Sequence, residues 1–133
     1  MNIFIAMPQN TVTDTFLTPA VTEQLAQIGD VKRNPYDRNL TAEELIQLAE
    51  DAEILITGWG TCYLTGEAVR KLPRLRMIAH TGGSVALLAD PDIYSVPGLR
   101  VISGNDVFAR SVAEGCLCYT LSALRRIEHF SSD

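Results

Sequence analysis

The sequence predicts an α/β fold, in which a parallel sheet of about five strands carries helices on both faces. Short apolar runs rich in β-branched residues alternate with segments whose apolar residues recur at helical spacing, and the connections are short. The chain has 133 residues, of which 47% are hydrophobic and 20% charged, as expected for one domain with one sizeable core. No internal repeat or low-complexity linker interrupts this alternation.

The first half of the chain predicts two helices among three strands. The strands are expected at residues 2–7 (NIFIAM), 31–34 and 53–57 (EILIT). A helix is predicted over residues 17–28, because Thr18 can cap it, Pro19 suits its first position and Gly29 stops it. The capping box Thr41-Ala-Glu-Glu44 begins a second helix.

The second half of the chain predicts two further strands and two helices. A short helix is expected at residues 65–71, strands at 76–80 and 99–103, and a long final helix from Ala109 to about Glu128. Asp90, Pro91 and Asp92 predict a turn that caps the short segment after it. This order of elements is typical of a flavodoxin-like, doubly wound sheet.

Polar and glycine-rich loops follow the predicted strands. The carboxyl ends of parallel strands meet at one edge of the sheet, where such folds bind ligands. The loops expected there are 8–10, 58–61, 80–90 and 104–106. In HTGGSVALLAD (80–90), two adjacent glycines allow a neighbouring element, a phosphate or a small substrate to approach the backbone. His80 is expected to be a hydrogen-bonded core or rim histidine rather than a base.

The composition argues against several functions. A net charge of −5 argues against nucleic-acid binding, and no apolar run approaches the ~18 residues of a membrane span. Neither GxGxxG nor GxxxxGK[ST] occurs, so the chain itself is expected to bind no cofactor, and no hydrolytic triad can be assembled. Cys62, Cys116 and Cys118 lack metal-ligand spacing, and we expect no metal site and reduced, buried thiols in a cytoplasmic protein.

Four stretches from residue 51 onward carry a family resemblance. They read DAEILITGWG, LTGEAVRKLPRLRMIAHTGGSV, LADPDIYSVPGLRVIS and SVAEGCLCYTLSALRRI. In this order and spacing the chain resembles the D-isomer-specific 2-hydroxyacid dehydrogenases, an NAD(P)-dependent family that includes glyoxylate/hydroxypyruvate reductases and phosphoglycerate dehydrogenases. The pattern fits without a gap from Gly83 to Glu114, whereas the first 50 residues fit by element order alone.

The resemblance implies that residues 1–133 are the substrate-side domain of a two-domain oxidoreductase. Residues 109–128 would be the helix leading toward the dinucleotide-binding domain, which would follow Asp133. In the family that second domain carries GxGxxG and the catalytic arginine, glutamate and histidine. NAD or NADP is therefore implied for the full-length enzyme, whereas no catalytic residue and no turnover are expected in this chain alone.

The resemblance also implies a set of site residues for a small 2-hydroxy or 2-keto acid. They are Trp59, Gly83, Ser84, Val85, Asn105 and Phe108. The backbone N–H groups of Ser84 and Val85, after Gly83, would receive the substrate carboxylate as an anion nest. Trp59 would either shape the pocket or be a half-buried rim aromatic. Phe108 stands where many members have asparagine. Either Asn105 or Asp106 would take that asparagine's place at the rim, or the pocket would prefer an apolar substrate.

The final helix carries two apolar stripes. One consists of Val112, Cys116, Tyr119 and Ala123, and the other of Ala113, Leu117, Leu121, Leu124 and Ile127. Two stripes predict burial on two sides, so the chain alone should expose an apolar patch and form a homodimer or self-associate through residues 112–127. The alternative function is a stand-alone flavodoxin-like binding or interaction module without catalysis. A reading frame that continues into GxGxxG would favour the enzyme.

Overall fold

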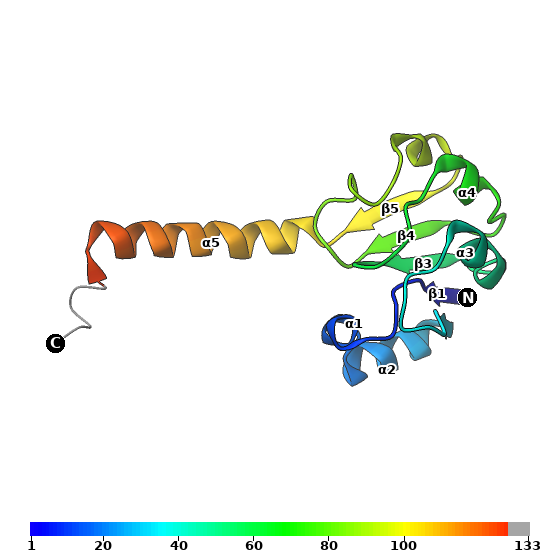
Figure 1. The fold of residues 1–133 in the computed structure, drawn as a ribbon, viewed down its shortest axis with the longest axis horizontal. Helices are drawn as coiled ribbons and strands as arrows, with labels where there is room; N and C mark the ends of the chain where they lie inside the picture. Colours follow the sequence, from blue (N-terminus) through cyan, green and yellow to red (C-terminus); the bar gives the residue numbers. More distant parts are fainter. Residues whose placement is uncertain (128–133) are drawn as a thin grey trace.

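The computed structural model describes residues 1–127 and contains a five-stranded, all-parallel sheet in the order β2-β1-β3-β4-β5. The strands are β1 (Asn2–Ile5), β2 (Asp30–Arg33), β3 (Ile54–Thr57), β4 (Met77–His80) and β5 (Arg100–Ser103). The helices are α1 (Thr11–Phe16), α2 (Pro19–Ile28), α3 (Ala42–Leu48), α4 (Gly66–Arg70), a 3-10 helix (Pro91–Ser95) and α5 (Asn105–Leu124). This strand order is the flavodoxin-like one, and the predicted fold class is confirmed (Figure 1).

The helix starts follow local capping chemistry. The Thr18 hydroxyl accepts from the Val21 N–H, and Pro19 occupies the first turn of α2, as predicted. Thr41 and Glu44 form the complete capping box of α3, because each side chain accepts from the backbone N–H of the other residue. Asp90 caps the 3-10 helix by accepting from the Asp92 N–H, which confirms the predicted turn.

Several element boundaries differ from the prediction. Helix α1 was not expected, and its N-cap is Asn10, whose side-chain oxygen accepts from both the N–H and the hydroxyl of Thr13. Strand β1 ends at Ile5 and β2 begins at Asp30. Helix α5 begins at Asn105 rather than Ala109, directly after β5, and Glu128 lies outside the described residues.

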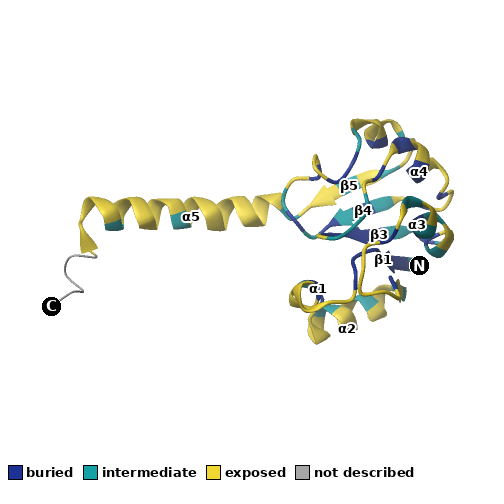
Figure 2. Ribbon diagram, in the orientation of Figure 1, coloured by how far each residue is buried: buried dark blue, intermediate teal, exposed yellow. Residues whose placement is uncertain are grey.

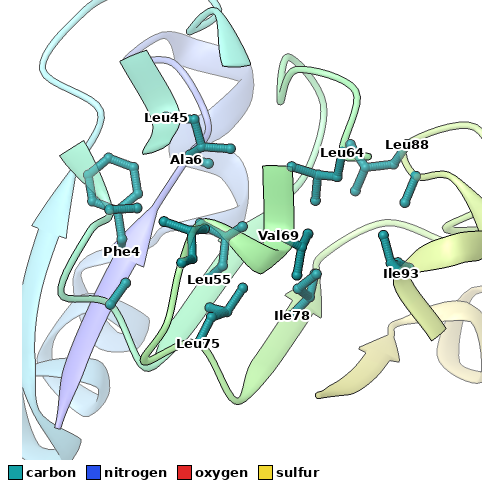
Figure 3. Packing of buried hydrophobic residues seen from close by; sticks show 14 of the residues in the cluster. Phe4, Ala6, Leu45, Leu55, Leu64, Val69, Leu75, Ile78, Leu88 and Ile93 are labelled. Atoms are coloured by element: carbon teal, nitrogen blue, oxygen red, sulfur yellow. The ribbon is translucent and has the colours of Figure 1, made fainter. Parts of the chain in front are cut away.

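The sheet separates two hydrophobic cores. The larger core packs α3, α4 and the 3-10 helix against one face, through residues such as Leu45, Leu55, Val69, Ile78 and Ile93 (Figure 3). The smaller core lies on the other face, where Ile3, Ile5, Met7, Leu17 and Ile56 meet Val21 and Leu25 of α2. Successive strand residues alternate between the cores, as a sheet covered on both faces requires.

The second face of the sheet is incompletely covered. A groove of about 300 Å³ runs between α2 and strands β4 and β5, and its lining includes Leu25, Ala79 and Ile102. Ile102 is 53% exposed because α5 does not fold back onto β5. Instead α5 leaves the carboxyl end of β5 and extends away from the sheet (Figure 1).

Helix α5 has no buried residue, so neither of its apolar stripes is covered (Figure 2). The predicted burial of this helix is not found on either side within residues 1–127, whereas the predicted exposed apolar patch is present. Cys116 and Cys118 are exposed for the same reason, and the expectation of buried thiols is wrong for them. Cys62 is half-buried, and burial raises the pKa of its thiol. Within residues 1–127 no helix is both long and apolar enough to span a membrane.

Candidate functional site

A cavity of about 290 Å³ opens at the carboxyl ends of β3 and β4. Its lining consists of Trp59, His80, Gly83, Ser84, Leu87 and Leu88. The parallel pairing of β3 with β4 brings the loop after Thr57 beside the loop after His80, because these two residues are register partners. The structure therefore places the predicted residues Trp59, Gly83 and Ser84 around one cavity.

The loop after β4 presents free backbone donors. Within residues 1–127 the N–H groups of Gly83, Ser84 and Val85 donate no hydrogen bond. The Val85 side chain is buried in the larger core, and its carbonyl accepts from the Leu88 and Ala89 N–H groups at 2.9 and 3.1 Å. This anchoring holds the loop while its donors stay available. Consecutive free N–H groups form the kind of nest that binds anions.

His80 and Thr57 form a buried polar pair beneath this loop. The Thr57 hydroxyl lies 3.1 Å from His80 Nδ1, and the two residues are 0% and 9% exposed. Burial lowers the pKa of His80, which favours the neutral imidazole. The expectation of a hydrogen-bonded core or rim histidine is confirmed.

Trp59 stands at the rim of the cavity. It is 67% exposed, and its ring meets Phe16 of α1 edge-on, with centroids 5.6 Å apart and planes at 83°. This contact holds the indole between the cavity and α1. Leu87, on the opposite loop, is exposed, so the cavity has an apolar wall open to solvent.

Asn105 and Phe108 do not line the cavity. Both lie in the first turns of α5, beside the loop. A methyl group at Gly83 would lie 3.4 Å from the Asn105 side-chain oxygen, and one at Gly104 would lie 3.1 Å from the Phe108 ring. The start of α5 is therefore adjacent to the anion nest.

The amides of the loop after β1 serve the fold. The Gln9 side chain donates to the Asn34 carbonyl, and Asn10 caps α1. Asn34 is fully buried and bonds the Arg38 carbonyl and the Tyr36 N–H. The bonds described use both ends of the Asn34 amide, but only the nitrogen of the Gln9 amide and the oxygen of the Asn10 amide. The residue that sequence reasoning missed is Thr57, and its only signal was a hydroxyl within the apolar strand EILIT.

Comparison with known proteins finds partial matches. No family model matches the chain. It is 30% identical over 116 residues to the D-3-phosphoglycerate dehydrogenase of Methanocaldococcus jannaschii, a match that covers 87% of this chain and 21% of that protein. The chain thus spans about a fifth of this relative.

Solved structures also match this chain over only part of their own length. A protein from Polaromonas sp. JS6 66, provisionally assigned as an NAD-binding D-isomer specific 2-hydroxyacid dehydrogenase, is 27% identical with a TM-score of 0.60, over 76% of this chain and 29% of its own. Two further structures share the fold. The D-lactate dehydrogenase of Escherichia coli is 17% identical with a TM-score of 0.62, over 98% of this chain and 40% of its own. The PH0520 protein of Pyrococcus horikoshii OT3 is 18% identical with a TM-score of 0.67, over 98% of this chain and 35% of its own. The predicted resemblance is thereby confirmed: over most of its length, this chain is similar to part of the D-isomer-specific 2-hydroxyacid dehydrogenases.

Proposed function

We propose that this chain is the substrate-side domain of an NAD(P)-dependent D-2-hydroxyacid dehydrogenase, which interconverts a small 2-keto acid and its 2-hydroxy acid. The observation that carries the proposal is the loop after β4. Within residues 1–127 the N–H groups of Ser84 and Val85 donate no hydrogen bond there, and Ser84 lines the cavity whereas Val85 does not. The similarity to dehydrogenases of this family supports it.

The site is suited to a small carboxylate. Consecutive N–H groups on Ser84 and Val85 can each donate to one carboxylate oxygen without a full positive charge. Trp59 and Leu88 offer apolar surface to the rest of the acid. Because backbone donors carry the contact, it does not depend on the Ser84 side chain, whereas the Val85 side chain anchors the loop in the larger core.

The described residues do not fit a dinucleotide. The loop after β1 has no glycine, the Gln9 N–H donates to the Tyr36 carbonyl, and Asn10 caps the six-residue helix α1. No pyrophosphate cradle of the usual kind is left there. We therefore assign no step of hydride transfer to these residues and expect a second domain to supply NAD or NADP. The pure 133-residue chain should oxidise neither NADH nor NADPH with any 2-keto acid.

The assembly and location are further parts of the proposal. The exposed apolar residues of α5, among them Val112, Leu117 and Leu124, support self-association or a homodimer through residues 112–127. The two exposed thiols of α5 support a cytoplasmic location, because an oxidising compartment would oxidise them.

Intrinsic fluorescence tests the binding proposal, because Trp59 is the chain's single tryptophan and lines the cavity. Titration with 2-oxobutyrate should change the emission saturably. A Kd on the order of millimolar is expected, because this domain would supply only part of the contacts to the acid. The methyl ester of the same acid is the control, since it lacks the carboxylate. An equal response to acid and ester, or no response to the acid, would contradict the proposal.

A further inference from the structure

The hydrogen bond between Thr57 and His80 has a defined donor and acceptor. Thr57 is fully buried, and within residues 1–127 its hydroxyl has one side-chain partner, His80 Nδ1 at 3.1 Å. A buried hydroxyl that donates nowhere is costly, so the hydroxyl donates to Nδ1. An imidazole nitrogen that accepts a hydrogen bond carries no proton, which places the proton of neutral His80 on Nε2.

The Nε2–H group is then a donor without an acceptor. His80 is 9% exposed, and among the described residues Nε2 makes no hydrogen bond. Its ring nevertheless lines the cavity together with Gly83 and Ser84. Nε2 is not among the buried side-chain atoms of residues 1–127 that lack a partner, so this donor is accessible from the cavity.

The loop passes close to this edge of the ring. A methyl group at Gly82 would lie 2.6 Å from His80 Nε2, so a larger residue there would have to displace the imidazole. The Gly104 N–H donates to the carbonyls of both His80 and Gly82 and ties the loop to β5. The imidazole is thus packed beneath the residues that carry the anion nest.

We propose that His80 binds the ligand directly: its Nε2–H donates to the carboxylate of the 2-keto acid received by Ser84 and Val85, and Thr57 holds the proton on that nitrogen. The inference rests on the proposed function and adds a side-chain contact to its backbone contacts. A neutral donor suits this role, since it strengthens anion binding while the buried ring carries no charge.

The tautomer can be tested without a ligand. Long-range ¹H–¹⁵N spectra of histidine-labelled protein at pH 7 should show His80 protonated at Nε2 only, with His129→Gln used to assign the two histidines. Thr57→Val removes the donor and should allow the Nδ1-protonated form to appear, whereas Thr57→Ser should preserve the wild-type spectrum. A proton on Nδ1 in the wild type would overturn the proposal.

The contact is tested by 2-oxobutyrate binding, followed through Trp59 emission. His80→Leu should raise the Kd about tenfold, the effect of losing one hydrogen bond to a charged group. His80→Gln, which keeps an N–H donor at similar reach, should lose less. In the wild type the Nε2–H resonance should move on saturation, a readout that does not depend on the stability of any variant.

The outcomes separate the two proposals. Two results would overturn the role of His80 and leave the proposed function standing. One is a folded His80→Leu protein with the Kd of the wild type for 2-oxobutyrate, and the other is an Nε2–H chemical shift that does not change when the acid is added. A wild-type protein that does not bind the acid would overturn the proposed function, and this inference with it.

Discussion

The sheet unit, residues 2–103, and helix α5 are held in place in different ways. Every buried apolar residue of the described chain lies in the sheet unit, in two cores on opposite faces of the sheet. Helix α5 is longer than any other helix of the described chain, yet it contains no buried residue. Leu117, Tyr119 and Leu124 are each more than half exposed.

This difference shows which part of the molecule is self-sufficient. The sheet unit has two hydrophobic cores of its own and leaves only part of one face open, at the groove beside Ile102. A helix that is apolar on two sides requires a covering partner. Asn105, in the first turn of α5, lies beside Gly83 of the anion nest. A partner that covers the first turns of α5 would therefore also approach the loop that carries the anion nest.

The largest expected effect separates the two regions by stability. Leu55 is fully buried in β3, so Leu55→Ala should lower the free energy of unfolding by about 2–5 kcal/mol. Leu121 is 52% exposed on α5, and at protein concentrations where the chain is monomeric Leu121→Ala should change the free energy of unfolding by less than about 0.5 kcal/mol. Urea denaturation measures both. Equal losses would mean that α5 is packed in solution.

Self-association is the second expected effect. Light scattering should give a molar mass that rises with protein concentration, and Leu117→Glu with Leu124→Glu should abolish this rise. The matched control is Ser111→Glu with Cys118→Glu, which has the same spacing and charge at exposed positions outside both stripes. A mass independent of concentration in the wild type, or equal effects of the two pairs, would count against the proposal.

A smaller effect is expected at the helix caps. Thr41→Ala removes the capping box of α3, a helix that packs into the larger core, and should cost about 1 kcal/mol of unfolding free energy. On α5 the Thr120 hydroxyl donates to the Cys116 carbonyl and to no other group of residues 1–127, so Thr120→Ala should be nearly neutral. Thermal denaturation compares the two. An equal change of Tm in Thr41→Ala and Thr120→Ala would contradict the difference in stability between the sheet unit and α5.

The smallest effect concerns pH. The hydrogen bond from Arg38, together with the Thr41 N–H, lowers the pKa of Glu44 to about 2 from 4.5. A carboxyl whose pKa is lowered by folding stabilises the protein above its unfolded pKa, and this contribution is lost as the pH falls through its folded pKa. The stability difference between wild type and Glu44→Gln should therefore be constant above pH 4.5 and shrink between pH 4.5 and 2. A difference that does not change with pH would show that the pair is screened by solvent.

The local features of the fold were predictable from the sequence because their chemistry is local. Thr18-Pro19 and Thr41-Ala-Glu-Glu44 hold their cap bonds within a few residues, and each appears in the structure where it was expected. Helix α5 begins at a position without a side-chain cap, so its first residue left no signal. Helix α1 is short and rich in threonine, and its Asn10 cap is its only strong indication.

The site depends on relations that the sequence does not contain. Trp59 and Gly83 meet only because β3 and β4 pair in parallel, and the Thr57–His80 bond follows from their register. The open groove beside Ile102 and the exposure of Cys116 follow from the direction in which α5 leaves the sheet. Helical periodicity shows that a stripe is apolar, but it does not show what covers the stripe.

The most direct test of the central claim is a ¹H–¹⁵N amide titration of the wild-type chain with 2-oxobutyrate. The Ser84 and Val85 N–H resonances should shift most, with saturation matching the Trp59 emission, and the methyl ester should leave them unchanged. The Ala86 N–H, which already donates to the Ser84 hydroxyl, is the internal reference and should move less. Shifts that gather elsewhere while Ser84 and Val85 stay still would contradict the account.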